Sequence, residues 1–339
     1  MCSMIDSDMP IINSKILREK LQENSIRIID VRRDQEYQQG HITNAVNLPL
    51  AKLLNDDSPE SIQKIAQDLG ISNDTPVVVY DDTFGALSSR VVWALQYIGH
   101  KDVKLLDVTF SQWKDLGYEI STEVPEIEPA THSVKINPEI MATAEYLEKV
   151  KENKNVVIID NRERLNYLEQ HIPGAINIPY RTLATDGKIL RTKEGMKTLL
   201  KNRGISEDAE IITYCGSVGT LSGLAYYALK SIGIPNVKLY VHSFKEWKSL
   251  EKPIDKQENA NYWDLSAEWY CMKDINDVMP KVPNMKWGAL LNKKPTNKKI
   301  EELNNLLPHN GRWHTVYEED DVSIIDGIPI IKKEKDSMT

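Results

Sequence analysis

Residues 28–50 of the chain read IIDVRRDQEYQQGHITNAVNLPL, and residues 158–180 read IIDNRERLNYLEQHIPGAINIPY. The two stretches align without a gap at an offset of 130 residues, so that Asp30 matches Asp160. A match of this length within one chain indicates that a single structural unit is present twice.

The similarity continues downstream at an offset of 134 residues, where Tyr80 matches Tyr214 and Trp113 matches Trp247. The larger offset predicts a short insertion in the second copy, near residues 186–192. Because the matches stay in register on both sides of this insertion, we interpret the chain as two copies of one domain.

The repeat also sets the expected domain boundaries. We expect a first domain at residues 10–122 and a second at residues 136–252. Residues 123–135 carry two prolines among acidic residues and are typical of an extended linker. Residues 256–339 lie beyond the repeat and hold four of the seven tryptophans, which is too aromatic for a disordered tail. This C-terminal extension includes a β-like stretch at residues 322–331, and no role follows from its sequence.

Within each copy, short β-branched runs alternate with stretches of helical periodicity. The expected strands are residues 27–31, 77–80 and 103–106 in the first copy and 156–160, 210–214 and 237–240 in the second. A helix is expected after the second strand of each copy, at residues 88–97 and 221–232. This alternation predicts the α/β class, with two domains that each hold a mostly parallel sheet flanked by helices.

Composition restricts the class of protein. The 339 residues carry a formal net charge of −8, which argues against a nucleic-acid binder, because such a protein normally has a clustered basic face. No apolar run reaches the roughly 18–20 residues of a membrane helix, and the N-terminus does not resemble a signal peptide. A cytoplasmic protein is therefore expected. The three cysteines, Cys2, Cys215 and Cys271, are too few and too scattered to predict a disulfide framework.

The two copies differ after their second strand, where Asp81 of the first takes the place of Cys215 in the second. The carboxyl end of a parallel strand is where such sheets bind ligands. The glycine-containing loop after Cys215 can direct backbone amides at one point, in front of the next helix. A thiol held there is expected to have a lowered pKa and to react as a thiolate. Asp81 is expected to fill the same cradle with a fixed carboxylate and to leave the first copy catalytically silent.

Three motifs of the second copy identify a family. They are D-x-R at residues 160–162, HIPGAINIP at residues 171–179, and Tyr214-Cys215 followed by a short loop. Together they resemble the rhodanese domain. Two copies with a cysteine only in the second resemble the tandem-domain thiosulfate and 3-mercaptopyruvate sulfurtransferases.

The resemblance implies that Cys215 takes up a sulfane sulfur as a persulfide and hands it to a thiol, to cyanide or to a thioredoxin-like protein. It also implies that Arg162 helps to bind a small anionic sulfur donor. The backbone amides implied to hold the persulfide belong to Gly216, Ser217, Val218, Gly219 and Thr220. Neither a cofactor nor a metal is implied.

The loop slightly favours 3-mercaptopyruvate over thiosulfate as the donor. It reads CGSVGT, which is similar to the C-G-S-G-V-[TA] loop of the mercaptopyruvate enzymes and lacks the basic residues typical of the thiosulfate enzymes. Val218 and Gly219 are exchanged relative to that pattern. The second arginine of the mercaptopyruvate type has no direct match, and Arg164 and Arg181 are the candidates to replace it.

Two further residues follow the third strand of the second copy. Ser243 matches the family pattern Y-D-G-S-W, whereas His242 replaces its glycine. We expect both to lie near the substrate pocket. On the first copy, Arg32, Arg33 and Arg90 are candidates to pair with Asp81 or Asp82, without a catalytic role.

Three other interpretations of the sequence are a cysteine phosphatase, a non-catalytic scaffold and a zinc-binding protein. A cysteine phosphatase needs an arginine six positions after the cysteine, where this chain has Leu221. A non-catalytic scaffold does not explain why Cys215 and its loop are present. A zinc site formed by Cys271, His309 and His314 lacks the usual four ligands and paired spacing.

Overall fold

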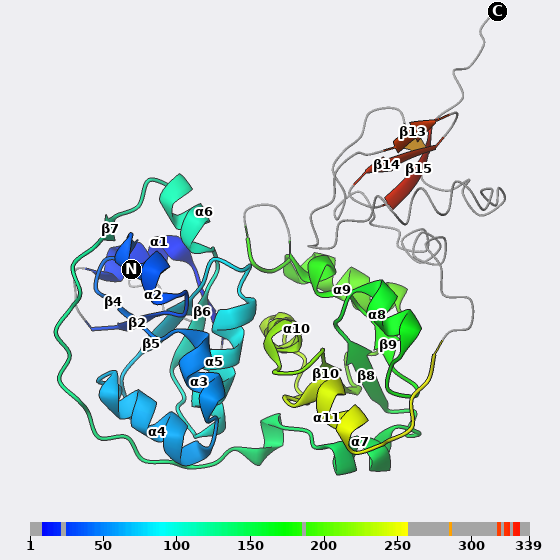
Figure 1. Cartoon of the computed structure of the whole chain (residues 1–339), viewed down its shortest axis with the longest axis horizontal. Coiled ribbons are helices and arrows are strands. Elements are labelled where there is room, and N and C mark those ends of the chain that lie inside the picture. Colours follow the sequence, from blue (N-terminus) through cyan, green and yellow to red (C-terminus); the bar gives the residue numbers. More distant parts are fainter. Residues whose placement is uncertain are drawn as a thin grey trace, which may run out of the picture.

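The computed structural model describes residues 9–21, 25–184 and 188–256, together with the backbone of four short strands between residues 285 and 332. Within this part of the chain, two α/β domains follow one another, as the sequence predicts (Figure 1). The helix α5 (Ala86–Tyr97) of the first domain faces α10 (Thr220–Ser231) of the second.

The first domain is built on a parallel sheet in the order β1-β6-β5-β2-β4. Its strands are β1 (Ile11–Ile12), β2 (Arg27–Asp30), β4 (Ala45–Asn47), β5 (Val77–Tyr80) and β6 (Val103–Leu106). The central strand β5 is buried along its whole length, which explains its unbroken apolar sequence VVVY. Besides α5, the helices are α1 (Ser14–Lys20), α2 (Asp34–Gln38), α3 (Leu50–Asn55), α4 (Pro59–Asp68) and α6 (Phe110–Asp115).

The second domain repeats this plan with a parallel sheet in the order β11-β10-β8-β9. Its strands are β8 (Val156–Asp160), β9 (Ile176–Asn177), β10 (Glu210–Tyr214) and β11 (Val237–Leu239). Besides α10, its helices are α7 (Ala144–Val150), α8 (Arg164–Glu169), α9 (Lys193–Asn202) and α11 (Ser243–Ser249), with 3₁₀ turns η2 (Pro138–Ile140) and η3 (Tyr180–Leu183).

Even the minor pairings are repeated. An antiparallel pair joins β3 (His41–Ile42) to β7 (Ile120–Ser121) in the first domain. Its counterpart in the second domain is a single antiparallel bridge between His171 and Asp255. The histidines at these equivalent positions bind backbone carbonyls, as expected of residues that hold a turn together; His171 Nδ1 lies 2.7 Å from the Tyr167 carbonyl.

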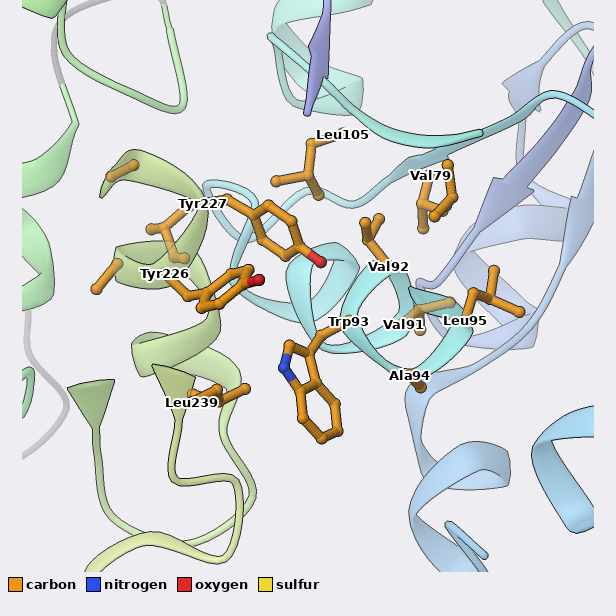
Figure 2. Packing of buried hydrophobic residues seen from close by; sticks show 14 of the residues in the cluster. Val79, Val91, Val92, Trp93, Ala94, Leu95, Leu105, Tyr226, Tyr227 and Leu239 are labelled. Carbon is orange, nitrogen blue, oxygen red and sulfur yellow. The ribbon is translucent and has the colours of Figure 1, made fainter. Parts of the chain in front are cut away.

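The two domains share one hydrophobic core where α5 meets α10 (Figure 2). Tyr226 and Tyr227 of α10 lie opposite Trp93 of α5, and the Tyr227 hydroxyl donates to Gln96 at 2.8 Å. The helices approach so closely that a Cβ atom at Gly223 would lie 2.9 Å from the Ser89 hydroxyl. The first domain is therefore packed directly against the helix that begins after Cys215.

The remaining segments agree with the sequence in part. Residues 123–135 contain no helix or strand, as expected of a linker. In the C-terminal extension, β14 (Val322–Ile325) and β15 (Ile328–Lys332) confirm the predicted β stretch and pair with β13 (Tyr317–Glu319) and β12 (Met285–Lys286). The extension's tryptophans, Cys2 and Cys271 lie outside the described residues. None of the described helices is long and apolar enough to cross a membrane.

Candidate functional site

Cys215 lies directly after β10, at the carboxyl edge of the second sheet, and its side chain is buried. Its backbone amide donates to the Ser243 hydroxyl at 3.1 Å, and that hydroxyl lies 3.7 Å from Cys215 Sγ. Cys215 and Ser243, both identified from the sequence and 28 residues apart, are thus brought into contact. Among the described residues, no other cysteine is present, so Cys215 is their one thiol.

Ser243 reaches the thiol through an unusual backbone conformation. Its φ angle of 58° lies in the left-handed region, which a serine rarely adopts outside constrained sites. The hydroxyl also lies 2.9 Å from the Tyr240 carbonyl and 3.3 Å from the Val241 carbonyl, so its single proton is shared among these two oxygens and the sulfur. The next two amides, of Phe244 and Lys245, donate to the carbonyls of Cys215 and Gly216. The start of α11 therefore fixes the Cys215 loop.

The loop after Cys215 ends in Gly219, which begins α10 with a φ of 73°. A Cβ atom at this position would meet the Val241 side chain at 3.0 Å, so only glycine fits the turn without strain. The first-turn amides of α10 have no partner within their own helix. The positive end of this helix of 12 residues therefore lies behind the thiol, where it favours a negative charge.

The first domain shows what the equivalent cradle holds. Asp81 Oδ1 accepts hydrogen bonds from the amides of Thr83 and Gly85, at 2.7 and 2.9 Å. Oδ2 accepts from the amide of Ser88 at 2.8 Å and from its hydroxyl at 3.1 Å. Complete burial raises the pKa of Asp81, and these four hydrogen bonds oppose the rise. The predicted fixed carboxylate is confirmed.

The guanidinium group of Arg162 is buried and bound to groups of its own domain. Its Nε and Nη2 atoms bind both oxygens of Asp160, at 2.6–3.1 Å, and Nη2 also donates to the Gln170 carbonyl at 2.6 Å. Burial lowers the pKa of Arg162, but the hydrogen bonds and charge of Asp160 outweigh this and raise it. In the first domain, Arg32 binds Asp30 at equivalent atoms. Donor binding by Arg162 stays a prediction, because the first domain builds the same arrangement without a thiol.

The other candidates from the sequence are placed as follows. Arg181 forms an ion pair with Glu163 at 2.5 Å, and the Arg164 guanidinium lies 4.9 Å from the centre of the Tyr167 ring. His242 is exposed and directly precedes Ser243. The described residues contain no group of three or more metal-binding side chains. Cys271, His309 and His314, which were considered for zinc, lie outside them.

The expectation that Arg90 or Arg32 pairs with Asp81 or Asp82 is wrong, because Arg32 forms its ion pair with Asp30. Arg90 extends from α5 to the second domain, where its Nε donates to the Val218 carbonyl in the Cys215 loop at 2.9 Å. Its Nη2 lies 2.5 Å from Asp57, so the ion pair forms with a loop of its own domain. Burial lowers the pKa of Arg90, opposed by the charge of Asp57. Asp81 is satisfied by its own loop and needs no arginine.

The geometry defines a class of protein: a tandem α/β chain in which two equivalent strand-to-helix loops hold a buried carboxyl group in the first domain and a buried thiol in the second. Residues 13–116 and 143–250 both match the rhodanese-like domain family. The chain belongs to this family and carries its domain twice.

Known relatives match this chain over most of their own length. The sulfur carrier protein TtuD of Thermus thermophilus is 30% identical over 278 residues, covering 73% of this chain and 97% of that protein. The thiosulfate sulfurtransferase of Pseudomonas aeruginosa is 27% identical over 260 residues, covering 71% and 95%. The crystal structure of SseA from Escherichia coli, described as a 3-mercaptopyruvate sulfotransferase, matches with a TM-score of 0.64 and 26% identity, covering 70% of this chain and 99% of SseA.

Proposed function

We propose that the protein is a sulfurtransferase that carries a sulfane sulfur as a persulfide on Cys215. The observation that supports this most directly is the side chain of Asp81, because the equivalent cradle of this same fold directs four hydrogen bonds at a buried carboxyl group. A cradle of that kind stabilises the thiolate that must attack and the persulfide anion that results.

The chemistry has two steps. In the first, the Cys215 thiolate attacks the terminal sulfur of the donor; a sulfur–sulfur bond forms, and the donor's bond to that sulfur breaks. The donor fragment leaves with the bonding electron pair. In the second step, a nucleophile takes the outer sulfur, and Cys215 leaves again as a thiolate. No net oxidation occurs over the cycle, because each leaving group retains the electron pair of the bond that breaks.

The donor that we favour is 3-mercaptopyruvate, with thiosulfate as the alternative. Residues 216–220 carry no basic side chain to hold the thiosulfate dianion. Relatives bear the names of both activities. The proposed contacts to the donor and the persulfide come from Arg162, His242 and Ser243 and from the loop Gly216, Ser217, Val218, Gly219 and Thr220. The proposed acceptor is a thiol, cyanide or a thioredoxin-like protein in the cytoplasm.

Mass spectrometry of the intact protein tests the proposal. Incubation with either donor should add the mass of one sulfur atom, and Cys215→Ser should abolish this addition. A variant with Cys2 and Cys271 replaced by serine is the matched control and should load as the wild type does. If neither donor adds sulfur, the non-catalytic scaffold is the better reading.

Steady-state kinetics then decide the donor. We expect a higher kcat/KM for 3-mercaptopyruvate than for thiosulfate, and the reverse order would make the chain a thiosulfate sulfurtransferase. Turnover of p-nitrophenyl phosphate should be absent, because Leu221 stands where a cysteine phosphatase needs an arginine.

A further inference from the structure

Before any sulfur is bound, Ser222 in the first turn of α10 has a buried hydroxyl group without a hydrogen-bond partner in the described part of the chain. Its side chain is inaccessible to solvent, and its hydroxyl has no hydrogen-bond partner among the described residues. Its backbone carbonyl, by contrast, accepts a hydrogen bond from Thr213 at 3.0 Å. Burying a hydroxyl without a partner destabilises a fold, because the group loses its hydrogen bonds to water. A hydrogen-bond acceptor that arrives with a bound group would therefore stabilise the buried hydroxyl of Ser222.

The counterpart of Ser222 in the first domain has such a partner. The offset of 134 residues that aligns Asp81 with Cys215 also aligns Ser88 with Ser222. The Ser88 amide donates to Asp81 Oδ2 at 2.8 Å, and the Ser88 hydroxyl lies 3.1 Å from the same oxygen and 3.2 Å from the Gly85 carbonyl. Both the amide and the hydroxyl of Ser88 thus point at Oδ2 of Asp81, the residue that takes the place of the cysteine in the first domain.

The two residues in that position become similar when the cysteine is loaded. In aspartate, the negatively charged Oδ atoms lie two bonds beyond Cβ. In a cysteine persulfide, the negatively charged outer sulfur Sδ also lies two bonds beyond Cβ. The unloaded Sγ is one bond shorter, and its hydroxyl contact is with Ser243. Asp81 therefore indicates where the outer sulfur of Cys215 lies and which donors surround it.

We propose that the Ser222 hydroxyl donates a hydrogen bond to the outer sulfur of the Cys215 persulfide; this inference rests on the proposed function. The bond forms only when sulfur arrives, because the unloaded Sγ does not reach as far. Ser222 therefore stabilises the loaded state over the unloaded one and shifts the loading equilibrium towards the persulfide. No proton is transferred: the serine keeps its hydrogen, and the sulfur keeps its charge.

A loading equilibrium measures this effect directly. Persulfide formed with either donor is equilibrated with mixtures of thiosulfate and sulfite, because sulfite takes the outer sulfur and releases the Cys215 thiolate and thiosulfate. Mass spectrometry then gives the loaded fraction at each ratio. We expect Ser222→Ala to lower the loading constant about tenfold, the effect of one hydrogen bond to a charged group. The matched control is Ser88→Ala, which removes the equivalent hydroxyl from the first domain and should leave the constant unchanged.

The melting temperatures should show the reverse pattern: the variant that leaves the loading constant unchanged should melt at a lower temperature, and the variant that lowers the constant should not. Ser88→Ala removes a hydrogen bond to the Asp81 carboxylate and should lower the melting temperature. Ser222→Ala removes a hydroxyl without a partner and should not lower it. Equal loading constants for wild type and Ser222→Ala would overturn the inference. Failure of the wild type itself to load would instead reject the proposed function, so the two failures are distinguishable.

Discussion

The Nε atom of Arg90, in the first domain, donates to the backbone carbonyl of Val218 at 2.9 Å, and Val218 belongs to the loop that follows Cys215. A second contact adjoins it, because the Ser89 hydroxyl lies 3.1 Å from the carbonyl of Thr220. The domain that lacks a thiol therefore orients two peptide groups of the loop that carries one. This gives the first domain a structural reason to be retained beside the second.

Arg90→Lys tests this support. Lysine keeps the charge near Asp57 but has no Nε–H group with the geometry to reach Val218. We expect kcat/KM for the preferred donor to fall about tenfold, a loss typical of a displaced peptide donor. Asp57→Asn is the control, because it removes the ion pair and leaves the Arg90–Val218 bond in place. If both variants lose activity equally, the ion pair and not the loop contact is what matters.

Arg162 and Arg32 form a matched pair that separates substrate binding from scaffolding. Both bind the aspartate two residues before them through the same atoms. Replacing either by glutamine should lower the free energy of unfolding by about 3–5 kcal/mol, because a buried aspartate loses its charged partner and keeps only neutral donors, a tyrosine hydroxyl among them. Donor binding predicts in addition that only Arg162→Gln raises KM. Equal KM values for the two variants, measured with the same donor, would assign Arg162 to the scaffold alone.

The sequence predicted the two α/β domains and the placement of Asp81 in its cradle because the duplication allowed one copy to be compared with the other, and the exchange of Asp81 for Cys215 indicated the candidate site. It did not predict the partner of Arg90. That contact depends on how α5 packs against α10, and the two helices are far apart in the chain. One signal was present, since a charged residue followed by Val91, Val92 and Trp93 in a buried helix must find a partner.

The role of Ser222 could not be predicted from the sequence for a related reason. That its hydroxyl is buried without a partner among the described residues depends on the packing around α10, and the pattern of apolar residues in the sequence does not indicate it. The left-handed backbone of Ser243 was equally hidden, because family resemblance identifies the residue type but not its conformation.

Asp81→Ala should destabilise the protein without affecting the chemistry. The variant leaves the buried donors of Thr83, Gly85 and Ser88 without their acceptor, at a cost of about 2 kcal/mol in the free energy of unfolding. Chemical denaturation measures this cost. Because the thiol belongs to the other domain, sulfur loading per folded molecule should stay at the wild-type level. Loss of loading in folded protein would show that the first cradle takes part in the reaction.

The linker is attached to the first domain by two buried histidines whose protonation should loosen it. His100 Nε2 lies 3.0 Å from the Thr75 carbonyl, to which it donates, so that its Nδ1 accepts from His132 Nε2 at 3.3 Å. Protonating His100 would place two N–H groups against each other. Burial lowers the pKa of both rings, and the proximity of His100 lowers that of His132 further, although Asp102 and Asp74 oppose the shift at His100.

These shifts fix the direction of a pH dependence. The unfolded chain takes up protons at the ordinary histidine pKa of about 6.5, and the folded chain only at lower pH. Stability is therefore complete above about pH 6.5 and falls as the pH decreases towards 5, by at most about 1.4 kcal/mol per pH unit for each histidine. His132→Asn should reduce this slope by roughly half, because one of two shifted groups is removed. His242→Asn, at an exposed histidine, should leave it unchanged. Urea denaturation between pH 7.5 and 5 gives the slopes, and the same slope in wild type and His132→Asn would show that the pair does not govern acid stability.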